Sequence, residues 1–240
     1  MPPLPKAMLI DLDETILTFG SRVEILTRVA EEFTSQIAPL SPTEIAIGME
    51  QALDDFWDDP TRHKEWRFKL LDSRILIAQM LFEKLRLSAP GLTPELATEF
   101  GTRFHDVRTS RLSAFPGAIE SLDMLKSMGI RTALITNGAA SVQRQKVEQF
   151  HLENRFDHIQ IEGEVGFGKP ETRAYTHAME VLQSEPHETW MIGDNLEWEI
   201  AAPQKLGIYS VWVDANRKGL PQKTEIRPDR IISSLTELLP

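Results

Sequence analysis

The chain of 240 residues is 41% hydrophobic and 26% charged, a composition typical of a globular protein that can bury a substantial core. It carries 26 Lys and Arg against 36 Asp and Glu, and the formal charge of −10 disfavours nucleic acid as the main partner, because it would repel a polyanionic backbone. The absence of cysteine excludes a disulfide framework, a thiol nucleophile and a thiolate metal site.

The first part of the chain is predicted to form one buried strand followed by helices. The apolar run at residues 7–10 ends at Asp11, which is typical of a strand that ends at a polar site. From about residue 20 to 112 apolar side chains recur every three or four residues, as in helices, and no strand interrupts the pattern. Four helices are expected in this region. The first begins near Val23, and the second begins at Pro42 within the capping box Ser41-Pro42-Thr43-Glu44. The third spans residues 63–87 and the fourth spans residues 94–108.

After Pro116-Gly117 helices and short β-rich runs alternate. Such alternation predicts an α/β fold with a Rossmann-like parallel sheet flanked by helices. We expect residues 1–19 and 113–240 to form this core, and residues 20–112 to form an all-helical cap inserted after the first strand. The predicted elements are helix 118–128, strand 131–136, helix 140–150, strand 158–161, helix 171–182, strand 189–192, helix 198–206 and strands 209–213 and 230–232.

Acidic side chains follow the first predicted strand and a later one. Asp11 and Asp13 are two positions apart in an extended segment, so both can face the same site. A cluster that also includes Asp194 is costly unless a cation lies among the carboxylates or a proton is shared. Oxygen ligands without suitably placed His or Cys favour a hard ion such as Mg²⁺. The sequence therefore predicts a magnesium site at Asp11, Asp13 and Asp194.

The other polar groups at the strand ends suit a phosphate monoester. Mg²⁺ and Lys169 can neutralise its charge, and the Thr136 hydroxyl and the Asn137 amide can hold its non-bridging oxygens. Asp11 can attack phosphorus and form a covalent intermediate, which divides a slow hydrolysis into two displacements. Asp13 can protonate the leaving oxygen and then activate water.

Four segments together carry a resemblance to a known family. They are Asp11-Leu12-Asp13-Glu14-Thr15, Thr136 at the end of Ala133-Leu134-Ile135, Lys169-Pro170 and Gly193-Asp194. In this order they resemble the four motifs of the haloacid dehalogenase-like hydrolase superfamily, in the branch with a helical cap. The resemblance implies that Asp11 is the nucleophile and Asp13 the general acid and base. It also implies that the Asp13 backbone carbonyl and Asp194 complete the Mg²⁺ ligands, with hinges near residues 19–20 and 110–116.

Two positions depart from the family pattern. Glu199 stands where the family often has Asp, and Pro203 stands where a small helical residue is common. We expect Glu199 to serve as a carboxylate that supports the site from behind its ligands. The six histidines form no recognisable ligand pair or triad, so we expect structural or surface roles for them.

A narrower resemblance concerns residues 135–147, 163–170 and 191–199, which look like the nucleotidase and N-acylneuraminate-9-phosphate phosphatase branch. It predicts a nucleoside monophosphate or a sugar phosphate as substrate. A haloacid dehalogenase would need neither magnesium nor an acid at Asp13, so Asp13 and Gly193-Asp194 argue against that alternative. A phosphomutase and a non-enzymatic binding protein remain as further alternatives.

The expected setting is the cytoplasm. The N-terminal residues lack the basic and apolar pattern of a signal peptide, and no segment approaches the roughly 20 apolar residues of a membrane span. We therefore expect a cytoplasmic enzyme that acts on a small phosphorylated metabolite and has no membrane or nucleic-acid partner.

Overall fold

The computed structural model describes residues 4–239. The contacts divide the chain into two compact units. One, the core, runs up to Thr18 and resumes at Ser113, and the other, the cap, is Phe19–Leu112. Among the described residues, no helix has both the length and the apolar character needed to cross a membrane.

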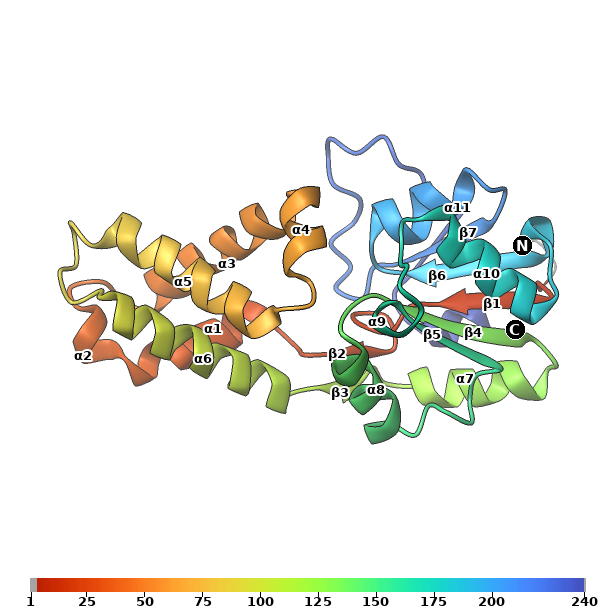
Figure 1. Cartoon of the computed structure of the whole chain (residues 1–240), viewed down its shortest axis with the longest axis horizontal. Coiled ribbons are helices and arrows are strands. Elements are labelled where there is room, and N and C mark those ends of the chain that lie inside the picture. Colours follow the sequence, from red (N-terminus) through yellow and green to blue (C-terminus); the bar gives the residue numbers. More distant parts are fainter. Residues whose placement is uncertain (1–3, 240) are drawn as a thin grey trace. The chain divides into compact units, whose positions relative to one another are not determined.

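The core is built on a six-stranded parallel sheet in the order β5-β4-β1-β6-β7-β8 (Figure 1). β1 lies in the middle because its four residues are all buried apolar side chains, which suits a strand covered on both faces. This sheet confirms the α/β fold predicted from the sequence. The strands are β1 (Ala7–Ile10), β4 (Arg131–Thr136), β5 (His158–Ile161), β6 (Thr189–Gly193), β7 (Tyr209–Val213) and β8 (Arg230–Ile232).

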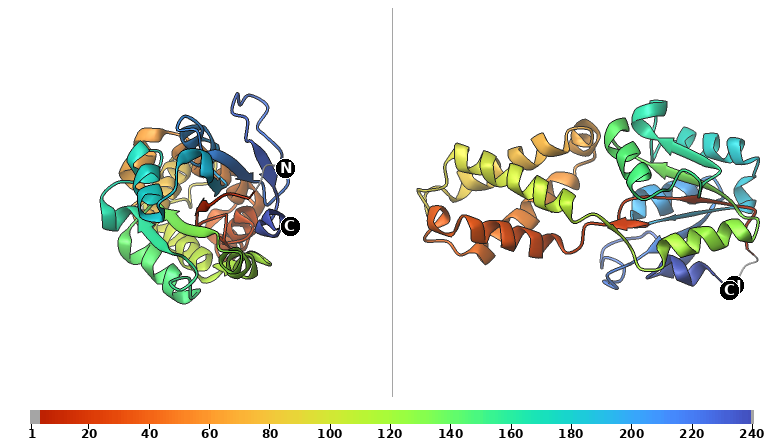
Figure 2. Two further views of the ribbon diagram at one scale, coloured as in Figure 1. Left: turned by 90° about the vertical axis from the view of Figure 1, so that its right-hand side faces the viewer. Right: turned by 90° about the horizontal axis from the view of Figure 1, so that it is seen from below.

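Helices cover both faces of the sheet (Figure 2). Side chains alternate between the two faces along each strand, and Leu9 and Ala133 point to the face covered by α10, where they pack with Tyr175 and Met179. The core helices are α7 (Ala118–Ser127), α8 (Ala140–Gln149), α9 (Glu162–Val165), α10 (Thr172–Leu182) and α11 (Ala202–Gln204), with short 3-10 turns at Pro186–Glu188 and Leu235–Leu238.

The cap consists of helices and has a hydrophobic cluster of its own. The predicted capping box begins α3: the Ser41 hydroxyl accepts from the Glu44 N–H, and the Glu44 carboxylate accepts from the Ser41 N–H at 2.8 Å. This reciprocal pair satisfies two backbone donors that have no partner within the helix. The cap helices are α1 (Arg22–Glu32), α2 (Thr34–Ile37), α3 (Pro42–Trp57), α4 (Pro60–Trp66), α5 (Leu70–Leu85) and α6 (Pro94–Ser110).

The single helix predicted for residues 63–87 is wrong, because two helices occupy this region. The Asp59 carboxylate accepts from the N–H groups of Thr61 and Arg62, so Pro60 begins α4 as well as ending the preceding helix. The chain then leaves helical geometry at Lys69, where φ is −129°, before α5 begins.

Two further features differ from the prediction. The helix expected at residues 198–206 begins earlier, as a π-helix at Leu196–Ala201, and ends as α11. A small antiparallel sheet of β2 (Leu17–Thr18) and β3 (Ser113–Ala114) was not predicted. Strands of two residues are too short to produce a hydrophobic period.

Candidate active site

Three parallel strands bring the predicted site residues to one edge of the sheet. β1 lies between β4 and β6, and the carboxyl ends of parallel strands meet at the same edge. Asp11 follows β1, Thr136 ends β4 and Asp194 follows β6. The backbone N–H of Asp11 donates to the carbonyl of Ile192 at 3.0 Å, which joins the first motif directly to the strand that carries the fourth.

Lys169 forms a buried ion-pair network with two carboxylates. Its Nζ lies 2.5 Å from Asp11 Oδ1 and 2.7 Å from Glu199 Oε1, and only 1% of the lysine surface is exposed. Burial alone would lower the pKa of Lys169, but the charges of Asp11 and Glu199 outweigh burial and raise that pKa above its ordinary value. Lys169 is therefore a fixed positive charge beside the predicted nucleophile.

Glu199 has both carboxylate oxygens engaged. Oε1 pairs with Lys169, and Oε2 accepts from the backbone N–H of Asn195 at 2.7 Å. A Cβ at position 193 would lie closer to the Cγ of Glu199 than two unbonded carbon atoms can approach. Glycine at position 193 therefore leaves the space that the Glu199 side chain occupies beside the fourth motif. The longer side chain of Glu199 thus fits at a position where the family pattern often has Asp, and it holds Lys169 through a buried ion pair.

Asn137 contacts the backbone of Lys169 through both ends of its side chain. Its Nδ2 donates to the Lys169 carbonyl at 2.7 Å, and its Oδ1 accepts from the Lys169 N–H at 2.9 Å. At most one Nδ2 hydrogen then remains for the phosphate contact predicted from the sequence. The geometry gives Asn137 the additional role of fixing the loop that carries Lys169.

Asp13 contacts two side chains that the sequence did not single out. Lys146 Nζ lies 2.7 and 2.8 Å from its two carboxylate oxygens, and Gln143 Nε2 donates to Oδ2 at 2.9 Å. Gln143 Nε2 also lies 2.5 Å from the hydroxyl oxygen of Thr136. The sequence feature that could have pointed to these residues is the spacing of Gln143 and Lys146, three positions apart in the helix that follows the second motif. Such a pair is usually interpreted as part of a solvated face.

Comparison with known proteins is decisive at the level of the family. Residues 5–207 match the model of the haloacid dehalogenase-like hydrolases. The chain belongs to this family. It is similar to a phosphoserine phosphatase of Thermus thermophilus, with 30% identity over 97% of each protein. It is also similar to a glyceraldehyde 3-phosphate phosphatase of Methanopyrus kandleri, with 25% identity over 93% of this chain and 89% of that protein.

The fold of this haloacid dehalogenase-like hydrolase is also seen in solved structures. The crystal structure of the hydrolase YfnB from Bacillus subtilis, bound to magnesium, matches 98% of this chain and 97% of its own, with a TM-score of 0.71 and 21% identity. The predicted superfamily and its helical cap are thus confirmed. The phosphatase relatives do not support the narrower resemblance to the nucleotidase branch.

The donor set of this family member fits a hard cation. Within residues 4–239 no three His, Asp or Glu side chains together form a metal site, but the expected ligand set needs only two carboxylates, because Asp13 would contribute its backbone carbonyl. Burial raises the pKa of Asp194 well above its ordinary value, and the charges of Glu199 and Asp11 raise it further. A cation between Asp11 and Asp194 would offset this repulsion.

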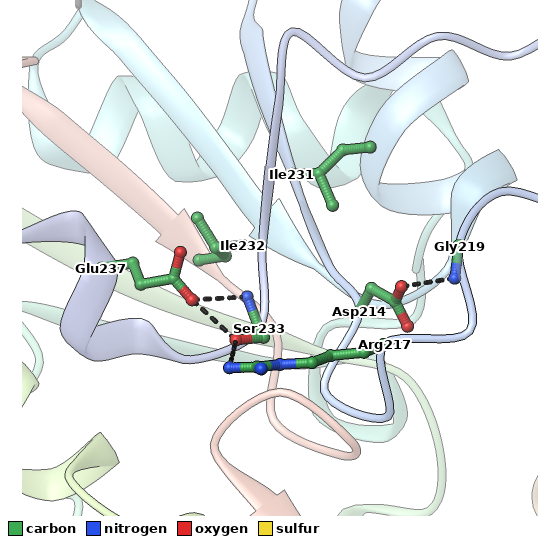
Figure 3. A pocket seen from close by; sticks show the side chains of 7 residues that line it. All are labelled: Asp214, Arg217, Gly219, Ile231, Ile232, Ser233 and Glu237. Carbon is green, nitrogen blue, oxygen red and sulfur yellow. Dashed lines mark hydrogen bonds between the residues drawn. The ribbon is translucent and has the colours of Figure 1, made fainter.

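A cavity of about 410 Å³ lies at the carboxyl ends of β7 and β8 and is lined by none of the predicted site residues (Figure 3). Its polar side chains bind one another: Glu237 accepts from the Ser233 N–H and hydroxyl at 2.8 Å, and Arg217 donates to the Ser233 hydroxyl at 3.3 Å. Asp214 accepts from the backbone N–H of Gly219 at 2.7 Å. These contacts tie the loop after β7 to the segment after β8.

Proposed function

We propose that the protein is a magnesium-dependent phosphatase that hydrolyses a small phosphate monoester through an aspartyl phosphate on Asp11. The observation that carries the proposal is the separate pairing of two neighbouring carboxylates. Asp11 pairs with the buried Lys169, whereas Asp13 pairs with Lys146 and Gln143. Two carboxylates with different environments suit two different roles, nucleophile and proton carrier.

In the first step a carboxylate oxygen of Asp11 attacks phosphorus. The bond between phosphorus and the ester oxygen breaks, and Asp13 gives its proton to that oxygen, so that the alcohol leaves neutral. Lys169 is 2.5 Å from Asp11 and offsets the negative charge that nucleophile and phosphate bring together. The Thr136 oxygen accepts from Gln143, and its hydroxyl hydrogen makes only a long contact of 3.5 Å with the Asn137 carbonyl, which supports a role for Thr136 as a donor to a phosphoryl oxygen.

In the second step water attacks the same phosphorus atom. Asp13, now a carboxylate, takes the proton of the water, and the bond between phosphorus and the Asp11 oxygen breaks. The products are the alcohol and inorganic phosphate, and both aspartates return to their starting protonation states. Asp11, Asp194 and the backbone carbonyl of Asp13 would hold Mg²⁺, which when bound supplies positive charge to the phosphoryl oxygens.

The relatives favour a short phosphorylated metabolite as substrate. The phosphatases that resemble this chain act, by their names, on phosphoserine and on glyceraldehyde 3-phosphate. We therefore place a phosphate ester of this size ahead of the nucleoside monophosphate or sugar phosphate suggested by the sequence alone. A phosphomutase would share the same core residues and is separated by the product, because it moves phosphate between positions of one molecule and releases little to water.

A haloacid dehalogenase is the second candidate, because the (S)-2-haloacid dehalogenase 1 of Pseudomonas sp. is 27% identical over 80% of this chain. A dehalogenase needs a nucleophilic aspartate but no acid at the position of Asp13. The three contacts that Lys146 and Gln143 make with Asp13 support a phosphatase instead.

The decisive experiment measures phosphate release from p-nitrophenyl phosphate with Mg²⁺. Asp11→Asn removes the nucleophile, and we expect kcat to fall by at least about 10⁴-fold, to background. Chelation of the metal should abolish wild-type activity. Full activity in Asp11→Asn, or activity that survives chelation, would contradict the mechanism. Chloride release from 2-chloropropionate without magnesium would identify a dehalogenase.

A further inference from the structure

We propose that Lys146 and Gln143 are positioning residues that hold the carboxylate of Asp13 in the orientation needed for proton transfer. The inference rests on the proposed function. It assigns a role to two residues outside the four motifs, both on α8.

The contacts define one orientation of the Asp13 carboxylate. Lys146 Nζ contacts both oxygens, at 2.7 and 2.8 Å, and Gln143 Nε2 contacts one of them at 2.9 Å. Rotation about the side-chain bonds of Asp13 would break at least one of these contacts. Gln143 also contacts Thr136 at 2.5 Å, so the proton carrier is tied to the end of β4. A proton donor held in place before the substrate binds loses less entropy in the reaction.

Burial indicates that these two side chains are not ordinary surface residues. Gln143 is 3% exposed and Lys146 is 8% exposed, and the other buried residue of α8 is Val147. The inner face of a helix usually carries apolar residues, and burying an amide and an ammonium group is unfavourable unless their hydrogen bonds are satisfied. Here most of the buried face of α8 is directed at Asp13 and Thr136 instead of the hydrophobic core.

The positive charge of Lys146 has a second consequence for the nucleophile. Asp13 is two residues from Asp11, and once it has given up its proton its negative charge would repel the phosphoryl group and the water that must approach it. Lys146 offsets the charge on Asp13, while Lys169 offsets the charge on Asp11. Each carboxylate thus has its own lysine. Because Lys146 contacts the proton carrier and Lys169 contacts the nucleophile, loss of Lys146 should impair the proton transfer more than the attack on phosphorus.

The experiment compares two aryl phosphates of similar shape. Phenolate is the more basic leaving group, so phenyl phosphate depends more on the proton from Asp13 than p-nitrophenyl phosphate does. We expect Lys146→Met to lower kcat about 10- to 100-fold with phenyl phosphate and less than about fivefold with p-nitrophenyl phosphate, with KM changed less than about threefold. Gln143→Leu should give the same pattern with a smaller loss, and Lys146→Arg should restore part of the rate.

The matched control is Arg144→Met. Arg144 lies on the same helix, and its replacement by methionine removes the same single positive charge. The Arg144 Nε donates to Glu164 Oε1 at 2.9 Å, so this residue contacts a different carboxylate from Asp13. We expect both substrates to be hydrolysed at the wild-type rate. Circular dichroism and the melting temperature establish that each variant is folded. If Lys146→Met does not fold, Gln143→Leu and Lys146→Arg provide the comparison.

A double-mutant cycle tests whether Lys146 acts through Asp13. In the Asp13→Asn protein, Lys146→Met should lower the rate less than about twofold further, because the group that Lys146 orients is already lost. If Lys146→Met lowers kcat equally with both substrates, or if its effect adds fully to that of Asp13→Asn, this inference is wrong. The proposed function would still hold in that case, because the wild-type enzyme would remain active. An inactive wild type, or an active Asp11→Asn, would instead refute the proposed function.

Discussion

Neighbouring side chains in this protein have different partners, and the partners determine what each side chain can do. Asp11 and Asp13 are close in sequence, yet one contacts a lysine from the loop before α10 and the other contacts a lysine from α8. At the residue scale, the pairing divides the two carboxylates into a nucleophile and a proton carrier. The same principle extends to the cap, where burial changes the behaviour of a histidine.

His63 predicts a pH dependence of stability. Burial, followed by the charge of Arg67, lowers the pKa of His63 from 6.5 to about 4, and its ring lies 5.1 Å from that of Trp57. Between these pH values the unfolded chain binds a proton that the folded chain does not. The stabilisation is therefore complete above pH 6.5 and lost as the pH falls. We expect the free energy of unfolding to fall by about 1 to 2 kcal/mol between pH 7 and 5 on this account.

Urea unfolding of wild type and His63→Gln at both pH values measures the effect. The variant should lose that part of the pH dependence, because glutamine does not titrate. Identical pH dependence in the two proteins would show that His63 binds its proton equally well in the folded and unfolded chains.

How much of the site was predictable depends on where each residue lies along the chain. Asp11 and Asp194 directly follow apolar strands, and that position marks a polar residue as a ligand-site candidate. Gln143 and Lys146 lie inside a helix, where a polar residue usually faces solvent. Only the packing of α8 against the site reveals that they are buried. The contact of Asn137 with Lys169 was equally hidden, because it joins residues far apart in sequence.

At the scale of elements, the core was predictable because its strands and helices end at clear signals. β1, β4 and β6 are strands of four to six residues that contain runs of three or four apolar side chains, and glycine or proline marks many of the turns. The break between α4 and α5 was not predictable, because apolar residues recur at helical spacing on both sides of it. That break depends on the backbone geometry at Lys69, which no residue pattern around it marks.

The pairing of α5 with α6 predicts a site that does not tolerate a larger side chain. A Cβ at Gly101 on α6 would lie 2.7 Å from the Cα of Ile75 on α5, and backbone atoms cannot move aside as a flexible side chain can. Gly101→Ala should therefore destabilise the protein by about 1 to 3 kcal/mol, despite the better helix propensity of alanine. Chemical denaturation measures the change.

Gly48→Ala is the control for this prediction. Its added carbon would meet only side-chain atoms of Leu81 at 3.3 Å, and these can shift. We expect a change of less than about 1 kcal/mol, since the gain in propensity opposes the crowding. A Gly101→Ala protein as stable as Gly48→Ala would show that α5 and α6 separate easily.

At the scale of the whole molecule, the cap and the core have separate hydrophobic clusters, and the proposed chemistry uses residues of the core. A ligand that binds only the folded core should stabilise it by mass action. Mg²⁺ at 100 times its dissociation constant should add about 2.7 kcal/mol to the free energy of unfolding. Calorimetry with and without Mg²⁺ measures this as a rise in melting temperature, independently of activity.

Asp194→Asn should lose the magnesium-dependent rise, because it removes one of two ligand carboxylates. Asp214→Asn is the control, because Asp214 follows β7 and contacts backbone N–H groups of its own loop. It should retain the rise relative to its own metal-free melting temperature. A wild-type protein whose melting temperature does not respond to Mg²⁺ would contradict the proposed metal site.

The short sheet of β2 and β3 has a consequence for how the chain can be rearranged. Thr18 pairs with Ser113 and Leu17 with Ala114, so the two points at which the chain leaves and rejoins the core are adjacent. In terms of connectivity the cap is the loop of a β-hairpin, and a turn of about two to five residues closes such a hairpin. Replacement of the helical segment between β2 and β3 by another segment would therefore leave the strand order of the six-stranded sheet unchanged.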